Sequence, residues 1–268
     1  MRLRMLGCGT SSGVPRIGSD WGTCDPAEPR NRRSRVSILI EEAGLVEEAG
    51  QGEEEGQGAR VLVDTSPDLR EQLLAAAVTE LDAVIWTHDH ADHCHGIDDL
   101  RQIFHARGAP VDGYARPDTL AALRRRFAYV FEGKGEYPPV VEPRPLPDRL
   151  QLGGLAITAI DQPHGSITAA GLCFEANGRR IGYSTDFNVL TDEMIALFEG
   201  VDVWVVDALR HRPHPSHPHL AQALEWIGIV APRRAILTHM DNSMDYRRLL
   251  AELPPGVEPG YDGLEVTL

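Results

Sequence analysis

Thr87-His88-Asp89-His90-Ala91-Asp92-His93 is the stretch that decides the fold, and it directly follows the apolar run Ala83-Val84-Ile85-Trp86. Three histidines and two aspartates occupy the six positions from His88 to His93. A strand that ends in a short loop of imidazoles and carboxylates predicts a metal site, because these groups suit zinc, manganese or iron. Side chains from so short a loop diverge in direction, so we expect two ions that share them.

The composition indicates a globular protein with a sizeable core. The chain has 268 residues, of which 42% are hydrophobic, and a net charge of −14. This acidity argues against broad binding to nucleic acid, so nucleic acid is not an expected partner. Part of the charge is local, because residues 43–58 are acidic and of low complexity. We interpret them as a solvated hairpin loop or a disordered insert, at about 42–59 of a single domain, 1–268.

The cysteines indicate a reducing compartment. Cys8, Cys24, Cys94 and Cys173 are scattered, which favours reduced thiols in a cytoplasmic protein. No apolar run approaches the roughly 18 residues of a membrane span, so no membrane association is expected.

Short apolar strands alternate with helical stretches along the chain, and this alternation predicts layered α/β packing. The expected strands are 3–6, 36–40, 60–63, 83–86, 155–160, 169–175, 180–184, 203–207, 235–237 and 264–267. Helices are expected to start near Pro67, Ile97, Pro117, Asp192, Leu220 and Asp245. The Pro-rich segment Tyr137–Pro147 predicts an extended connection.

Further ligand candidates follow other predicted strands. His164, Asp186 and His239 each stand where an apolar strand gives way to a polar loop. Two ions need more ligands than the loop at His88–His93 supplies, and these three residues are of the right chemical type.

The motif His-x-His-x-Asp-His resembles that of the metallo-β-lactamase superfamily, and the resemblance extends over nearly the full chain. It is closest to the phosphoribosyl 1,2-cyclic phosphate phosphodiesterases of bacterial phosphonate degradation. The segments that carry it are Leu6–Pro15, Thr87–Arg101, Pro213–His217, Leu237–His239 and Gly260–Val266.

The resemblance implies an αββα sandwich of two mixed β-sheets flanked by helices. It implies that His88, His90 and His164 hold one divalent ion, Zn²⁺ or Mn²⁺. It also implies that Asp92, His93 and His239 hold a second ion and that Asp186 bridges both. Two such ions lower the pKa of a bridging water and create a hydroxide nucleophile. The implied activity is hydrolysis of a small cyclic phosphate ester, with Asp92 and His217 expected to serve in catalysis.

The segment Arg210–His219 carries four histidines, two arginines and three prolines. By resemblance, His217 is the general acid, and histidine suits this role because its unperturbed pKa is about 6.5. We interpret His211, His214 and His219 as solvated. Arg210, Arg212 and Ser12 are candidate contacts for a small phosphorylated substrate. Asp64 is expected to orient a ligand histidine, as are His95 and Asp98 or Asp99.

Two alternatives stay open. One is an RNA-processing nuclease resembling the tRNA 3′-end endonucleases, for which Arg30–Arg35 would be the phosphate-contacting candidate; Arg124–Arg126 are interpreted as a solvated helix face. The other is a non-catalytic, metal-containing binding protein of the quinone-cofactor biosynthesis type. Cys24 stands alone where the resembled enzymes cluster cysteines, so no structural zinc is expected. Relatives often dimerise, and a homodimer is left open.

Overall fold

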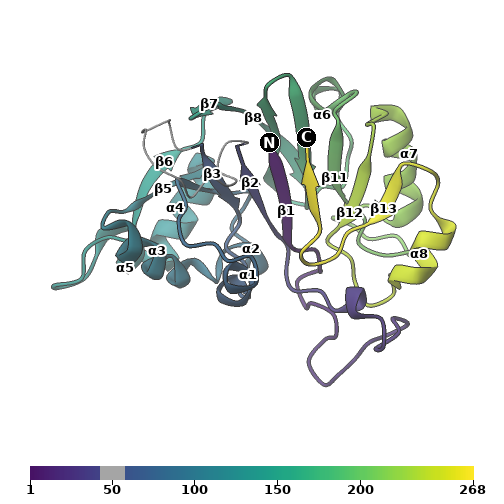
Figure 1. Cartoon of the computed structure of the whole chain (residues 1–268), viewed down its shortest axis with the longest axis horizontal. Helices are drawn as coiled ribbons and strands as arrows, with labels where there is room; N and C mark the ends of the chain where they lie inside the picture. The colour runs from purple at the N-terminus through teal and green to yellow at the C-terminus, as the bar shows by residue number, and fades with distance from the viewer. Residues whose placement is uncertain (43–57) are drawn as a thin grey trace, which may run out of the picture.

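Two β-sheets pack face to face in the computed structural model, which describes residues 1–42 and 58–268 (Figure 1). In spatial order, the first sheet contains β14 (Glu265–Thr267), β1 (Arg2–Gly7), β2 (Ser37–Glu41), β3 (Arg60–Val63), β4 (Ala83–Trp86), β5 (Val111–Ala115) and β6 (Val141–Pro145). The second contains β13 (Val257–Pro259), β12 (Ala235–Thr238), β11 (Val203–Asp207), β10 (Arg179–Ser184), β9 (Ile167–Ala176), β8 (Leu155–His164) and β7 (Arg149–Leu152).

Helices cover the outer face of each sheet, which completes the predicted αββα sandwich (Figure 1). The first sheet is covered by α1 (Leu69–Ala75), α2 (Ala91–Cys94), α3 (Leu100–Arg107), α4 (Pro117–Arg126) and α5 (Ala128–Glu132). The second is covered by α6 (Asp192–Phe198), α7 (Leu220–Val230) and α8 (Tyr246–Glu252). Two short 3₁₀ helices, η1 (Pro29–Asn31) and η2 (Ile97–Asp99), lie in connecting segments. Thr191 caps α6: its side chain accepts a hydrogen bond from the Met194 amide.

Strand β4 shows why the run before the histidines is apolar throughout. Ala83 and Ile85 belong to the core between the two sheets, whereas Val84 and Trp86 pack under the helices of the first sheet. All four are fully buried. A parallel strand that is buried on both faces has no polar side, so its sequence cannot alternate. The candidate metal-binding loop, His88–His93, therefore begins at the end of a strand that is buried on both faces.

Both sheets mix parallel and antiparallel pairs. Strands β3 to β6 run parallel to one another, while β1 and β2 pair antiparallel. Strands β10 to β13 are parallel, and β8 and β9 form an antiparallel pair that continues into β10. As a result, β4, β8, β10 and β12 all deliver their C-terminal ends to the same edge of the sandwich.

Several strands were missed by the sequence analysis, namely β5, β6, β7 and β13. The segment Tyr137–Pro147 was predicted to be a connection, but it contains β6. Pro143 and Pro145 lie within this strand, and they are tolerated because β6 is the last strand of its sheet and needs partners on one side only.

The predicted acidic insert falls almost wholly on residues 43–57, which lie outside the described residues. The strands that flank it, β2 and β3, pair antiparallel, with Glu41 opposite Arg60. The two ends of the insert therefore meet at one edge of the sandwich.

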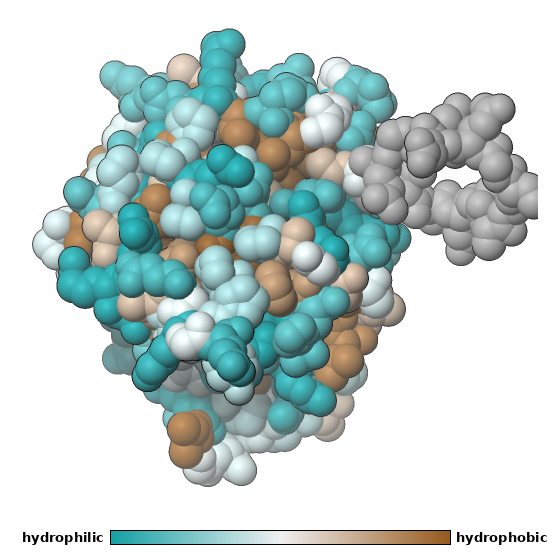
Figure 2. All heavy atoms as spheres, turned by 90° about the vertical axis from the view of Figure 1, so that its left-hand side faces the viewer, coloured by the Kyte–Doolittle hydropathy of each residue, from teal (hydrophilic) through white to brown (hydrophobic). Residues whose placement is uncertain are grey.

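The face formed by α3, α4 and α5 is largely hydrophilic, with small separated apolar areas (Figure 2). Over residues 1–42 and 58–268, none of the helices combines the length and the apolar character that crossing a membrane would require.

Candidate metal centre

The edge where β4, β8, β10 and β12 end carries all seven predicted ligands. His88 and His90 lie in the loop after β4, and Asp92 and His93 lie on the short helix α2 that follows. The others stand at the ends of the second sheet's strands: His164 is the last residue of β8, Asp186 follows β10, and His239 follows β12. Both sheets therefore contribute to one cluster, and all of these residues except the exposed His90 are buried.

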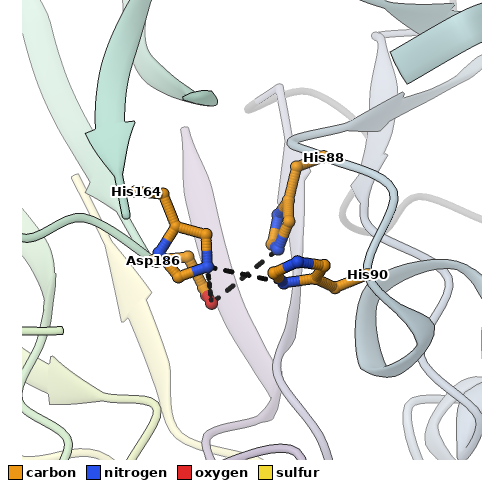
Figure 3. A group of neighbouring side chains, drawn as sticks. All are labelled: His88, His90, His164 and Asp186. Atoms are coloured by element: carbon orange, nitrogen blue, oxygen red, sulfur yellow. Dashed lines mark hydrogen bonds and ion pairs between the residues drawn. The ribbon is translucent and has the colours of Figure 1, made fainter. Parts of the chain in front are cut away.

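One carboxylate oxygen of Asp186 faces three histidines (Figure 3). Asp186 Oδ1 lies 3.5 Å from His164 Nε2 and 3.8 Å from His88 Nε2. His90 Nδ1 lies 3.4 Å from His164 Nε2. These four residues, two from the loop after β4 and two from the ends of β8 and β10, surround a single point.

The other oxygen of Asp186 faces a second group. Asp186 Oδ2 lies 3.1 Å from His93 Nε2 and 3.6 Å from His239 Nε2. Asp92 Oδ2 lies 3.5 Å from His93 Nε2 and 3.4 Å from His239 Nε2. Asp186 thus stands between the two groups, with one oxygen directed to each.

These separations fit divalent ions. With metal–ligand bonds of about 2.0–2.1 Å, the donor atoms of a tetrahedral site lie about 3.3 Å apart. The distances in both groups, 3.1–3.8 Å, are close to this value. Among the described residues, the buried Nε2 atoms of His88 and His93 have no hydrogen-bond partner. Buried polar atoms normally have one, so these nitrogens are available to an ion.

The electrostatics differ between the two groups. In the second group burial alone would lower the pKa of His93 and of His239, but nearby carboxylates, Asp186 first, raise the pKa of His93 well above its usual value and that of His239 to about 9. The first group and the bridging carboxylate suit metal ligands. Burial lowers the pKa of His88 well below its usual value, and it lowers that of His164 as well. Both imidazoles are therefore neutral, which is the form that binds a metal. Burial alone would raise the pKa of Asp186, but the surrounding histidines, His239 and His93 first, hold it well below its usual range. The carboxylate is therefore ionised.

The backbone is bent at the site. Asp64, Asp186 and His239 have positive φ angles of 62°, 54° and 56°. Asp64 and His239 directly follow the last residues of β3 and β12, and Asp186 is the second residue after β10. Non-glycine residues adopt this left-handed conformation rarely and at an energetic cost. The turn redirects each side chain from the sheet toward the cluster.

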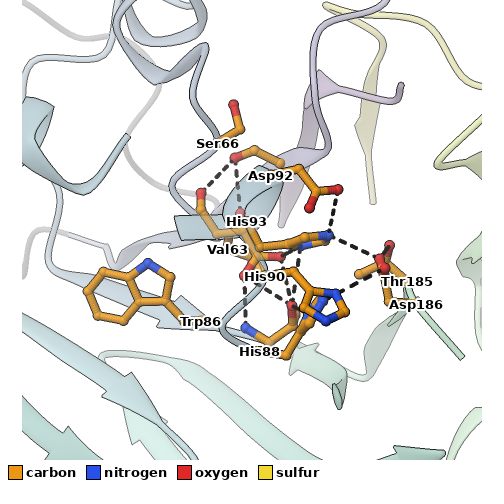
Figure 4. Close-up of polar contacts among 12 residues, drawn as sticks. Val63, Ser66, Trp86, His88, His90, Asp92, His93, Thr185 and Asp186 are labelled. Atoms are coloured by element: carbon orange, nitrogen blue, oxygen red, sulfur yellow. Dashed lines mark hydrogen bonds and ion pairs between the residues drawn. The ribbon is translucent and has the colours of Figure 1, made fainter. Parts of the chain in front are cut away.

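The carboxylate of Asp64 holds one histidine of the cluster directly and a second through Thr87. Figure 4 shows how the two histidines, His93 and His88, lie beside Asp92 and Asp186. Asp64 is fully buried, and its Oδ2 lies 2.7 Å from His93 Nδ1. Its Oδ1 accepts the Thr87 amide at 2.8 Å. The Thr87 hydroxyl lies 3.1 Å from His88 Nδ1. Asp64 accepts a hydrogen bond from Nδ1–H of His93, which leaves the lone pair on Nε2 directed to the cluster. Asp64 thus lies where a residue that orients a ligand histidine is expected.

His217 reaches the cluster from the segment between β11 and α7. Its Nδ1 lies 2.7 Å from Asp207 Oδ2, and its Nε2 lies 3.8 Å from Asp186 Oδ1. Asp207 is fully buried and also accepts the Asp186 amide at 3.1 Å. Sequence reasoning missed Asp207 as a functional residue. Its only signal was its position at the end of a buried strand, beside the strand that delivers Asp186.

The three predicted substrate contacts do not join the cluster. The Arg210 guanidinium instead donates to the carbonyl groups of Arg212 and Pro213, at 3.1 and 2.8 Å, within its own loop. The Arg212 side chain is exposed. Ser12 is exposed in a turn and lines a hollow of about 600 Å³, whose other walls include Arg32 and Arg35 but none of the seven ligands.

Other expectations need correction. His95 is exposed and meets the ring of Phe127 edge-on, away from the cluster. Asp98 lines a separate surface hollow, and Asp99 is partly exposed on η2. His95 follows α2, and Asp98 and Asp99 lie on η2, so the chain has left the cluster before it reaches them.

Arg126 departs from the predicted solvated face. Its guanidinium contacts the carboxylate and the backbone carbonyl of Asp89, in the middle of the metal-binding loop. Helix α4 therefore braces this loop from outside.

The remaining loop histidines lie around His217. His214 Nδ1 accepts the Ser216 amide at 3.3 Å, and His211 is exposed. His219 is partly exposed at the start of α7, but its Nδ1 is buried without a partner among the described residues. All four cysteines are free and buried, and Cys24 lies 3.9 Å from an Arg33 nitrogen.

The fold and the His/Asp cluster define a hydrolase of the metallo-β-lactamase fold. The family model described as "Beta-lactamase superfamily domain" matches residues 59–240. Over its full length, the chain resembles the crystal structure of a diphosphatase from the PhnP family, with a TM-score of 0.86, 31% identity and 97% of that chain covered. The chain belongs to the metallo-β-lactamase superfamily, in its PhnP-like branch.

Two further relatives extend the comparison. An octanoyltransferase of Porphyromonas gingivalis is 33% identical over 100% of the chain, although the chain spans only 52% of that relative's length. Coenzyme PQQ synthesis protein B of Methylobacterium radiotolerans is 25% identical over 77% of the chain and 72% of its own length. The human short-form tRNase Z shares the fold at 15% identity and a TM-score of 0.70, covering 100% of this chain and 99% of its own.

Proposed function

We propose that the protein is a divalent-metal-dependent phosphodiesterase that hydrolyses a small phosphate ester. The observation that carries the proposal is the position of His217, which is held by Asp207 and presents Nε2 to the cluster 3.8 Å from Asp186. The likeness to a PhnP-family diphosphatase over the whole chain supports a phosphoryl substrate.

The proposed reaction assigns separate roles to the residues of the cluster. Two divalent ions, Zn²⁺ or Mn²⁺, would lower the pKa of water and neutralise charge on the phosphoryl oxygens. His88, His90 and His164 would hold one ion, Asp92, His93 and His239 the other, and Asp186 both. His217 donates the Nε2 proton to the leaving oxygen. Asp207 accepts a hydrogen bond from Nδ1–H throughout and thereby keeps the ring oriented.

The substrate we propose first is 5-phosphoribosyl 1,2-cyclic phosphate or a related cyclic nucleotide. Its leaving group is a sugar alkoxide, a poor leaving group that requires a proton, and His217 provides one. The second candidate is a small diphosphate ester, because the structural relative with 31% identity is named a diphosphatase. Either substrate is small and phosphorylated. We also propose that the reaction takes place in the cytoplasm.

The two alternatives are less well supported. A metal-containing binding protein needs no residue placed as His217 is. The nuclease alternative rests on Arg30–Arg35, but within this segment the Arg33 side chain is buried and donates to the Met244 carbonyl at 2.6 Å. Arg35 pairs with Asp68 at 3.0 Å. Two of its arginines are thus already paired, Arg33 in the interior and Arg35 at the partly exposed surface.

The test is phosphorus NMR of 5-phosphoribosyl 1,2-cyclic phosphate and of a nucleoside diphosphate ester, each incubated with metal-reconstituted protein. We expect the cyclic ester to be converted to a monoester, and His217→Ala to slow the conversion by about 10²–10⁴-fold. His211→Ala is the matched control, because it removes an exposed histidine from the same loop. Turnover of the diphosphate ester alone would favour the second candidate. Turnover of neither substrate, with metal bound, would refute the proposal.

A further inference from the structure

We propose that Asn188 is a positioning residue that holds the general acid in place through the loop 210–219, called here the acid loop. This inference rests on the proposed function, because it assigns Asn188 to the step that His217 performs. Asn188 stands two residues after Asp186 and is partly exposed. No sequence motif marks it.

The acid loop cannot hold itself together by backbone hydrogen bonds alone. Pro213, Pro215 and Pro218 lack an N–H group, so three of its ten positions have no backbone donor. Backbone bonds hold the loop near its two ends, from the Leu220 amide to the Arg210 carbonyl at 2.8 Å and from the Leu209 amide to the Pro218 carbonyl at 3.1 Å. Between these bonds, side chains attach the loop at three consecutive residues. Asn188 Nδ2 donates to the Pro215 carbonyl at 2.9 Å. His164 Nδ1 lies 2.9 Å from the Ser216 carbonyl oxygen.

The third attachment is the hydrogen bond between His217 and Asp207, at 2.7 Å. Two of the three attachments therefore come from groups of the candidate metal centre or its immediate support. Asn188 is the only one of the three anchoring side chains that is neither a proposed ligand nor in contact with His217. Its role must be to fix the backbone that carries the acid.

The side-chain carbonyl oxygen of Asn188 explains why an asparagine is needed at this position. Its Oδ1 accepts the Gly165 amide at 3.3 Å, and its backbone N–H donates to the Pro163 carbonyl at 2.9 Å. Asn188 thereby joins the turn after β8 to the acid loop. The two segments are in close contact, since a Cβ placed on Gly165 would lie 3.3 Å from Ser216 Cβ.

An amide can donate and accept at the same time, whereas a carboxylate only accepts. Asn188→Asp is therefore a selective change: it retains the acceptor for Gly165 and loses the donor to Pro215. The loop is then free to shift by a fraction of an ångström. A misplacement of about 1 Å can cost 10²-fold in rate, so we expect a loss of about 10-fold for a smaller shift.

The test compares two diesters in the metal-reconstituted protein. 5-Phosphoribosyl 1,2-cyclic phosphate releases an alkoxide that needs a proton, whereas bis(p-nitrophenyl) phosphate releases a stabilised phenolate that does not. We expect Asn188→Asp to lower kcat about 10-fold for the cyclic ester and less than about twofold for the nitrophenyl ester. In a His217→Ala background, Asn188→Asp should cause no further loss, because both changes act on one step.

A readout independent of activity is hydrogen exchange of the peptide that contains the acid loop, which should become faster in Asn188→Asp. Metal content per chain and Tm should stay unchanged. Gln151→Ala is the matched control: it removes a side-chain donor to the Gly153 carbonyl at 2.8 Å, at the far end of the β7–β8 hairpin.

The outcomes separate the two proposals. If His217→Ala slows both esters equally, the general-acid role fails, and unchanged exchange of the acid loop in Asn188→Asp then overturns the Asn188 proposal too. If His217→Ala is selective for the cyclic ester but Asn188→Asp is not, only the Asn188 proposal is overturned. A loss of metal in Asn188→Asp would also overturn it, because the residue would then act on the metal centre.

Discussion

Replacing Asp64 by Asn should invert the tautomer of His93 and weaken metal binding. The Thr87 amide donates to Asp64 Oδ1 at 2.8 Å, so the side-chain oxygen of an asparagine must take that place. Its NH₂ group then faces His93 Nδ1, which lies 2.7 Å from the present Oδ2. An NH₂ group can only donate, so His93 Nδ1 must accept and Nε2 must carry the proton. That proton occupies the lone pair that faces Asp186 at 3.1 Å.

The substitution leaves the backbone undisturbed, because asparagine tolerates the φ angle of 62° at this position at least as well as aspartate. Loss of such a supporting partner typically costs 10–100-fold in metal affinity, or about 1.4–2.8 kcal/mol. We expect the larger value, since the hydrogen bond is reversed and not merely weakened.

The assay is a titration of Zn²⁺ or Mn²⁺ in competition with a chromophoric chelator, with circular dichroism to establish that the variant is folded. Asp68→Asn is the matched control, because Asp68 is a nearby carboxylate that binds Arg35 and not a histidine. Unchanged affinity in Asp64→Asn, or an equal loss in Asp68→Asn, would refute the tautomer argument.

Three further changes test other parts of the molecule. Asp207→Asn should slow turnover of an alkoxide ester about 10–100-fold with metal content retained, because His217 loses its charged acceptor; equal slowing of a nitrophenyl ester would contradict this. Gly113→Ala would place a Cβ 2.7 Å from the Trp86 ring, and urea unfolding should show a loss of about 1–3 kcal/mol. Burial raises the pKa of Asp262 to about 6, so the folded state favours the protonated acid. Its contribution to stability is therefore present below pH ~4 and lost as pH rises to ~6, and urea unfolding of Asp262→Asn across this range should lack that decline.

The sequence was most informative where the chemistry is local. Four ligand candidates stand within six residues, and strand β4 before them is apolar on both faces, so both features could be predicted. His164, Asp186 and His239 lie far apart in the chain. Their types and positions after strands marked them as candidates, but the pairing of each with an ion came from the family resemblance.

The predictions that the structure does not follow have different physical causes. Arg126 is predicted to lie on a solvated helix face, yet it binds Asp89, 37 residues earlier in the chain. The substrate contact of Arg210 stays a prediction; in the structure its guanidinium donates to carbonyl groups that only the folded loop presents. Strand β5 was missed because Asp112 and Gly113 interrupt its apolar pattern.

The left-handed residues at Asp64, Asp186 and His239 have a consequence for how this protein can change over time. At an ordinary position of this kind, glycine is the substitution that relieves strain and raises stability. Here that substitution would delete a carboxylate or an imidazole from the cluster. A variant selected only for thermal stability is therefore expected to acquire changes at these positions and to lose metal, whereas selection for activity keeps three strained turns in place. Stability and activity thus oppose each other at these positions, independently of any substrate.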